Sequence, residues 1–365
     1  MREILDIVDT FERVKRHGKT GVLASVVRVE GSTYRRPGAR ALFLPGDEVI
    51  GLIGGGCLEN DLLLQAEKVR KNGRPKRIGY DNTSDDEIVW GLGLGCNGKV
   101  DVLLEPVGPG QPGPLEFIAR CLKDRMRGVM ATVIRSLDSS RLASRWMCDA
   151  GGAVQWSSNW DDRVDLSGQV AEVKAARKPQ VVAIRDREIL VEPVELPIRL
   201  LVVGAGPDAL PLVTFADRLG WSVEVFDHRE AFARADRFPG ARSVSVVPVK
   251  DMARVVQTDR RTAVVLMTHH FLHDCELLHG FLRSNAGYCG VLGPKARLER
   301  LLDALKNNAS TSLAQSRQWV KGPVGLDIGA ETPEEIALSI VAEIQACFAG
   351  RDGMPLSRKA GPIHA

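Results

Sequence analysis

The sequence predicts an α/β protein with a C-terminal Rossmann-like doubly wound parallel sheet and an N-terminal mixed α+β domain. Two observations predict this fold class. From Arg199 onward, short apolar runs alternate with amphipathic stretches, which is the pattern of a parallel sheet with helical crossovers. The first apolar run leads into GAGPDA (204–209), a glycine-rich turn between a predicted strand and a predicted helix.

The change of pattern at Arg199 also predicts the domain organisation. The sequence is expected to form an N-terminal α+β domain (1–195, with a loop or linker near 108–114), a Rossmann-like domain (196–348) and a flexible tail (349–365).

Composition limits the classes of partner. The chain has 365 residues, 44% apolar and 26% charged, which is a normal globular balance. Its net charge of +3 is too small to indicate nucleic-acid binding. We see no signal peptide and no apolar run of about 18 residues, so we expect a cytoplasmic protein with no membrane partner. The seven cysteines include no CxxC pair, which argues against disulfides and iron–sulfur clusters.

The N-terminal elements follow from hydrophobic periodicity. Ile4, Val8 and Phe11 share one face of an expected helix. A hairpin is expected around Pro45-Gly46-Asp47. Residues 128–195 contain short β-like runs that form either more sheet of the first domain or a small β insertion. The predicted elements are helices 2–17 and 57–71, and strands 21–29, 39–44, 48–53, 99–105, 128–134, 145–148, 180–184 and 188–191.

In the C-terminal half the last helix has the clearest signal. Thr332 is its expected N-cap, Pro333 takes its first position and Glu335 completes a capping box. The predicted elements here are strands 199–203, 222–227, 243–248, 262–268 and 288–292, and helices 207–219, 274–284, 295–306 and 333–347.

The turn after the first strand of this half is a candidate nucleotide site. Gly204 permits the tight turn, and Gly206 lets backbone amides approach a pyrophosphate. Asp227 ends the next strand, roughly 20 residues on, where a ribose hydroxyl would bind. Asp208, however, would place a negative charge beside any phosphate. A Rossmann scaffold without a nicotinamide cofactor is therefore an equally weighted alternative.

Gly54-Gly55-Gly56-Cys57 joins a predicted strand to a predicted helix in the N-terminal half. Three glycines permit a nest of backbone amides that would suit an anion or a pterin phosphate. Cys57 would stand at a helix N-terminus, where a thiolate is favoured. The alternative, a small buried thiol in a tight turn, is slightly favoured from residue chemistry alone.

Two further loops resemble ligand loops. Cys96 lies in GLGLGCNG (91–98), which is either a ligand-approach loop or a flexible connector. GSTYRRPG (31–38) carries Arg35 and Arg36, which could grip a phosphate, although a solvated basic loop is the plainer interpretation.

Histidines 269, 270 and 273 follow the fourth strand of the second half. A zinc site needs ligands held on one rigid face, and these lie on a turn, so we assign no metal site. Asp274 is the expected N-cap of the next helix. We interpret the segment as a ligand-facing loop at the carboxyl end of the sheet.

Together these segments resemble the XdhC/CoxI family of xanthine dehydrogenase accessory proteins. The matching segments are GSTYRRPGA (31–39), GLIGGGCLE (51–59), GCNGKVDVLLEP (95–106), LLVVGAGPDA (200–209), VFDHREAFARADRFPGA (225–241), MTHHFLHD (267–274), YCGVLG (288–293) and GPVGLDIGAETPEEIALSIVAEI (322–344).

The resemblance implies a maturation protein that binds sulfurated molybdenum cofactor and delivers it to a xanthine-dehydrogenase-type hydroxylase. A cysteine desulfurase is a further implied partner, and a homodimer is the default state. Within the matching segments, the cofactor-binding candidates are Ser32, Arg35, Arg36, Gly54, Gly55, Gly56, Cys57, Glu59, Cys96, Gly204, Gly206, Asp227, Arg229, Thr268, His269 and Asp274, with Cys57 and Cys96 as candidate reactive thiols.

The sequence departs from the family pattern at Pro207-Asp208, at Asn97 and at His270. The first departure weakens the case for a bound dinucleotide such as NAD(P). An NAD(P)-dependent oxidoreductase is the alternative function, with His269 as its acid–base candidate. A non-catalytic docking scaffold is the third hypothesis.

Overall fold

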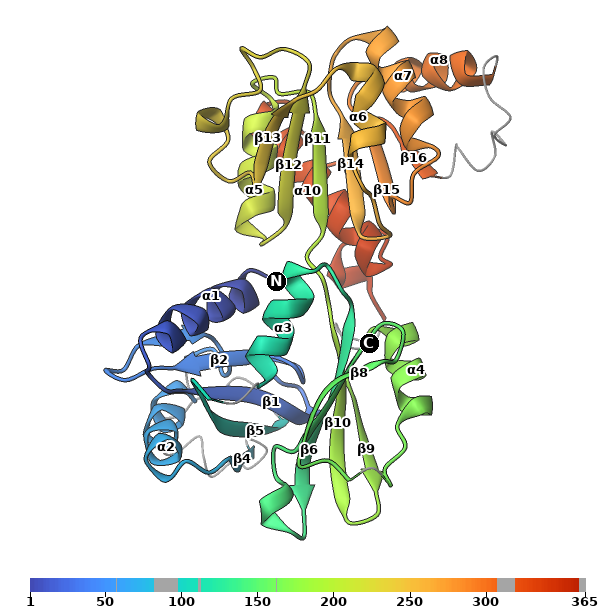
Figure 1. Ribbon diagram of the computed structural model, residues 1–365. Helices are drawn as coiled ribbons and strands as arrows, with labels where there is room; N and C mark the ends of the chain where they lie inside the picture. The colour runs from blue at the N-terminus through green and yellow to red at the C-terminus, as the bar shows by residue number, and fades with distance from the viewer. Residues whose placement is uncertain (57, 82–97, 111–112, 162, 307–318, 361–365) are drawn as a thin grey trace. The chain divides into compact units, whose positions relative to one another are not determined.

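The structure is a computed structural model that describes the whole chain except residues 57, 82–97, 111–112, 162, 307–318 and 361–365. The chain divides into two compact units, Glu3–Leu196 and Pro197–Ala365, the second of which also includes Met1–Arg2 (Figure 1). Among the described residues, no helix is both long enough and apolar enough to cross a bilayer.

The N-terminal unit begins with an antiparallel sheet in the order β3-β2-β1-β5-β4. Helix α2 covers one face, where Leu62, Ala66 and Val69 pack against Val22 and Ala24. Apolar side chains of α1 pack on residues of the opposite face. The elements are α1 (Arg2–Arg16), β1 (Gly21–Gly31), β2 (Arg40–Phe43), β3 (Val49–Gly51), α2 (Glu59–Asn72), β4 (Lys76–Asp81) and β5 (Gly98–Val107).

Residues 128–194 form a second antiparallel sheet of the same unit, in the order β8-β7-β6-β10-β9. Met130 and Met147 share a core with Leu23 and Leu42 of the first sheet, so this region is not a separate insertion. The elements are α3 (Pro114–Lys123), β6 (Gly128–Ser136), β7 (Arg145–Asp149), β8 (Val154–Ser158), α4 (Ser167–Ala176), β9 (Gln180–Ile184) and β10 (Arg187–Val194).

The sequence analysis did not predict several elements of this unit. Helix α3 begins at Pro114, the last residue of the predicted linker, because proline is tolerated at the first helical position. Strand β5 continues through Pro106, which pairs with Val22, although we expected the strand to end at Glu105. Strands β4 and β8 and helix α4 were also missed, because none carries a strong apolar periodicity.

The C-terminal unit contains a six-stranded sheet in the order β13-β12-β11-β14-β15-β16, and its recorded strand pairs are parallel. This is the strand order of a Rossmann fold, as the sequence predicted. The strands are β11 (Arg199–Val203), β12 (Ser222–Asp227), β13 (Ser243–Val246), β14 (Thr262–Leu266), β15 (Tyr288–Val291) and β16 (Val320–Lys321).

Helices pack on both faces of this sheet, which makes it doubly wound (Figure 1). The capping box of Thr332 and Glu335 is present as predicted. One helix starts earlier than expected: His270, not Asp274, is the N-cap of α7, because Asp274 is drawn into buried contacts inside the first turn. The helices are α5 (Ala209–Arg218), α6 (Val249–Val255), α7 (Phe271–Phe281), α8 (Lys295–Lys306) and α10 (Pro333–Ala349).

Candidate functional site

Two loops of the N-terminal unit and the start of strand β5 meet at one end of its first sheet. Gly31 pairs with Gly98 across strands β1 and β5. A side chain at Gly98 would lie 2.6 Å from the backbone oxygens of Glu30 and Ser32, so only glycine fits there. The ring of Tyr34 lies against Gly55, and the Arg35 Nε donates to the Leu52 oxygen at 3.1 Å. We call residues 31–38, 52–56 and 98 the glycine-loop cluster.

A carboxylate already fills the backbone nest of this cluster. Glu59 Oε1 accepts from the Ile53 amide at 3.0 Å and from the Gly54 amide at 2.8 Å, while Oε2 accepts from the Gly56 amide at 2.8 Å. The positive φ angles of Gly55 (71°) and Gly56 (104°) create this geometry. The nest therefore binds an anionic group, and an incoming anion would have to replace Glu59.

The polar side chains of the 31–38 loop differ in how firmly they are held. Arg35 is bonded to both Leu52 and Glu3. Ser32 and Arg36 are exposed, and Tyr34 keeps 58% of its surface exposed. An exposed aromatic ring beside a glycine-rich backbone is suited to stacking on a flat ligand.

The two candidate reactive thiols, Cys57 and Cys96, lie outside the described residues. Among the described cysteines, Cys121, Cys148 and Cys289 are buried. Burial raises the pKa of the Cys121 thiol to about 12, so this thiol is inert at neutral pH.

The second predicted site lies at the carboxyl edge of the Rossmann sheet. Gly204 has φ 116°, and a side chain there would lie 2.4 Å from the Met267 oxygen. Asp227 accepts from the Ala205 amide at 2.7 Å, and from the Arg229 amide, Nε and Nη2 at 2.9, 3.0 and 2.8 Å. Asp227 is 2% exposed, so its carboxylate orders the glycine turn and is already well supplied with donors.

These bonds predict a pH dependence of stability. Burial by itself raises the pKa of Asp227, but hydrogen bonds from Arg229 and from the Ala205 and Arg229 amides outweigh burial and lower the pKa to about 2. A lowered folded-state pKa stabilises the fold above the unfolded value near 4, and this contribution is lost as the pH falls from about 4 to about 2. Asp227→Asn should therefore unfold with a shallower dependence on pH in this window. Urea titrations at several pH values test this, and equal slopes for both proteins would contradict it.

The remaining predicted residues of this edge pair with one another. His269 has a positive φ of 57°, and its Nε2 lies 2.8 Å from Asp208 Oδ2. Thr268 Oγ1 donates to Asp274 at 2.5 Å, and Arg297 Nη2 donates to the same carboxylate at 2.7 Å. Asp274 is 1% exposed, so it holds the loop in place and does not face a ligand.

No group of three or more metal-ligating side chains occurs among the described residues. The rings of His228 and His270 pack against that of His273, at centroid distances of 4.7 and 4.0 Å. Burial, followed by the two neighbouring histidines, lowers the pKa of His273. His228, His270 and His273 thus form a cluster of packed rings, whereas His269 contacts Asp208.

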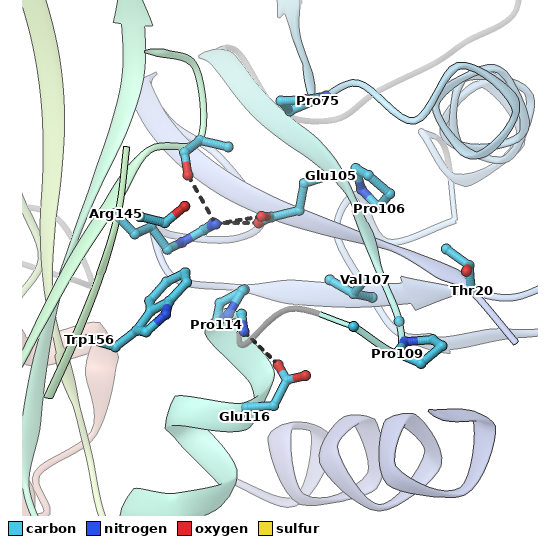
Figure 2. A pocket seen from close by; sticks show the side chains of 15 residues that line it. Thr20, Pro75, Glu105, Pro106, Val107, Pro109, Pro114, Glu116, Arg145 and Trp156 are labelled. Carbon is cyan, nitrogen blue, oxygen red and sulfur yellow. Dashed lines mark hydrogen bonds and ion pairs between the residues drawn. The ribbon is translucent and has the colours of Figure 1, made fainter. Parts of the chain in front are cut away.

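Sequence reasoning missed a cavity of about 510 Å³ in the N-terminal unit. Figure 2 shows Arg145 and Glu105 joined by two bonds on its wall. Both residues are 5% exposed. The one feature of the sequence that pointed to this cavity was the carboxylate of Glu105, at the end of the apolar run VDVLLEP (100–106). Its partner, Arg145, lies far away in the sequence, so the pair could not be predicted.

Comparisons with known proteins match both units to the same family. Residues 14–81 match the model of the XdhC and CoxI family, and residues 200–344 match that of the XdhC Rossmann domain. A Bacillus subtilis protein, named as a probable xanthine dehydrogenase subunit, is 34% identical over 325 residues, or 88% of this chain and 92% of that protein.

Two further matches differ in extent. An uncharacterised Escherichia coli protein, YqeB, is 28% identical over 149 residues, which is 40% of this chain and 26% of that protein. The crystal structure of a xanthine dehydrogenase from Bacillus halodurans aligns with a TM-score of 0.78 at 31% identity, covering 98% of each chain.

Proposed function

Because this chain belongs to the XdhC and CoxI family, we propose that it is an accessory protein of a xanthine-dehydrogenase-type enzyme, which binds molybdenum cofactor and delivers it to that enzyme. The client is thus a molybdenum hydroxylase. A cysteine desulfurase that supplies sulfur, and a homodimeric state, are parts of the same proposal.

The observation that carries the proposal is the anion-binding nest in the glycine-loop cluster. Molybdenum cofactor is a pterin that bears a phosphate, so its binding needs both an anion site and a surface for a flat ring. The amides of Ile53, Gly54 and Gly56 already hold the Glu59 carboxylate, and a phosphate could replace that group. The exposed ring of Tyr34 offers the stacking surface.

In this proposal the side chains of the cluster have separate roles. Arg36 is exposed and supplies positive charge to the phosphate. Glu59 holds the nest in shape until the cofactor arrives and leaves it on binding. Cys57 and Cys96 lie outside the described residues. We propose that they hold the part of the cofactor that carries the molybdenum-bound sulfur.

The second candidate is an NAD(P)-dependent oxidoreductase, which the contact between His269 and Asp208 favours as an acid–base pair. The carboxyl edge, however, fits a dinucleotide poorly. A side chain at Gly206 would lie 2.4 Å from Asp208 Oδ1, so a carboxylate lies where a pyrophosphate would approach. Steady nicotinamide-dependent turnover above about 1 s⁻¹ would raise this candidate to first place.

A reconstitution assay tests the proposal. The protein, loaded with molybdenum cofactor, is mixed with apo-hydroxylase, and both the cofactor retained per chain and the client activity are measured. Tyr34→Ala should weaken cofactor binding by about 5- to 150-fold, because stacking on an aromatic ring contributes roughly 1–3 kcal/mol. The matched control is Leu64→Ala, which removes another exposed side chain (63%) of the same unit.

Thiol variants form the second arm of the assay. Cys57→Ala should fold but fail to activate the client, and Cys96→Ala should weaken activation. The control is Cys347→Ala, which removes an exposed thiol. Cys121 is unsuitable as a control, because its side chain is buried in the core and its loss would affect stability. If Tyr34→Ala, Cys57→Ala and Cys96→Ala all load and activate like the unmodified protein, the assignment of the glycine-loop cluster is wrong.

A further inference from the structure

Four of the seven histidines of the chain lie at the carboxyl edge of the Rossmann sheet. His228 directly follows β12, whereas His269, His270 and His273 follow β14. The ring of His273 contacts the rings of both His228 and His270. We call these three residues the histidine cluster. The cluster joins the end of β12 to the first turn of α7.

Helix α7 begins with an N-cap that can acquire a positive charge. His270 is this N-cap, and its Nδ1 accepts from the His273 amide at 3.4 Å. An imidazole nitrogen accepts a hydrogen bond only while it is unprotonated. The common N-cap residues serine, threonine, asparagine and aspartate never become cationic. A protonated His270 would therefore lose the capping bond and place a positive charge at the positive end of the helix dipole.

His273 lies between the other two rings, where a proton is also unfavourable. Its Nδ1 is buried and has no hydrogen-bond partner among the described residues. Burial, followed by the two neighbouring imidazoles, lowers the pKa of His273, and the opposite effect of Asp274 and Glu276 is smaller. A lowered folded-state pKa stabilises the packed cluster above the unfolded value near 6.5, and this contribution is lost as the pH falls below that value.

The carboxylates beside the cluster are already engaged by arginines. Asp227 lies 3.3 Å from His228 Nδ1, but it also accepts from Arg229 Nη2 at 2.8 Å. Asp274 accepts from Arg297 Nη2 at 2.7 Å. Protons added to the cluster would therefore meet two guanidinium groups whose charges are only balanced by these carboxylates, so they would not be fully compensated.

The loop that precedes α7 depends on its surroundings for its conformation. His269 has a φ of 57°, which residues with a side chain rarely adopt, and it keeps this angle while bonded to Asp208 at 2.8 Å. The next residue is the N-cap, so loss of the cap would remove one of the contacts that hold this backbone.

We propose that the histidine cluster is a pH-sensitive switch: protonation of His270 and His273 below about pH 6.5 releases the first turn of α7 and the loop 267–270 from the end of β12. This loop lies at the carboxyl edge, where Rossmann folds bind their ligands. The switch thus makes a ligand-facing loop of the Rossmann unit sensitive to pH. It is independent of the cofactor site proposed for the glycine-loop cluster of the other unit.

Hydrogen-exchange mass spectrometry of the full chain at about pH 7.5 and about pH 5.5 tests the switch, with rates corrected for the intrinsic effect of pH on exchange. Amides of residues 267–276 should lose about tenfold or more of their protection at the lower pH. This is the size expected when an N-cap is lost and a charge opposes the helix dipole. Peptides of α10, whose N-cap is Thr332, should keep their protection.

The double variant His270→Asn/His273→Leu removes both titrating rings but keeps a capping side chain and an apolar one. Protection of its residues 267–276 should change by less than about twofold between the two pH values. His279→Leu is the matched control, because it removes a histidine of the same helix outside the cluster, and it should keep the full response of the unmodified protein.

The comparison of α7 with α10 in the unmodified protein needs no variant, so it decides the matter even if the double variant does not fold. Equal protection of 267–276 at both pH values, or an equal loss in α7 and α10, overturns the proposal. A tenfold loss that the folded double variant retains also overturns it. Asp227 does not confuse the result, because its pKa of about 2 lies well below both pH values.

Discussion

Gly204→Ala should unfold the Rossmann unit or destabilise it by at least about 3 kcal/mol, because two costs add. Its φ of 116° is one that residues with a side chain rarely adopt. The new methyl group would also lie 2.4 Å from the Met267 oxygen, at the end of the neighbouring central strand. Neither the turn nor β14 can move without disturbing the core shared by Val202, Val265 and Met267.

Hydrogen-exchange mass spectrometry measures this effect unit by unit, since peptides from β11 and β14 report the Rossmann core. Gly168→Ala in α4 is the matched control. This glycine has open space around its position for a side chain, so alanine should be neutral or stabilise the helix by up to about 1 kcal/mol. Unchanged protection of β11 in Gly204→Ala would show that the turn tolerates a side chain.

Arg145→Met should lower the free energy of unfolding of the N-terminal unit by about 3–5 kcal/mol, because it leaves the buried Glu105 carboxylate without its partner. The double variant Glu105→Gln/Arg145→Met should recover much of this loss, since it removes both charges together. Urea unfolding of the two single variants and the double variant gives the coupling energy between the side chains.

Arg135→Met is the control for the loss of an arginine from the same sheet. The Arg135 side chain is 68% exposed, and its partner Glu188 also contacts Arg28 and Arg77. This exposed pair should contribute less than about 1 kcal/mol. Equal losses of unfolding free energy in Arg135→Met and Arg145→Met would show that the buried Glu105–Arg145 pair contributes no more to stability than an exposed pair.

The Rossmann half was largely predictable because its signals are local. The boundaries of β11 and β12 were predicted from their apolar runs, and Gly204 from its position between a strand and a helix. The capping box of α10 depends only on Thr332 and Glu335, three residues apart. Elements without such signals, such as the charged edge strand β4 and the short helix α6, were missed.

The sequence by itself determined the fold class of both halves, the family, and the loops that carry polar and glycine residues. The tertiary structure decided which groups those residues bind. Glu59 fills the nest, Asp227 holds the glycine turn, and Glu105 finds Arg145 on another sheet. The physical reason is that a buried polar group takes whichever partner the packing of distant strands brings within about 3 Å, and local sequence carries no record of that partner.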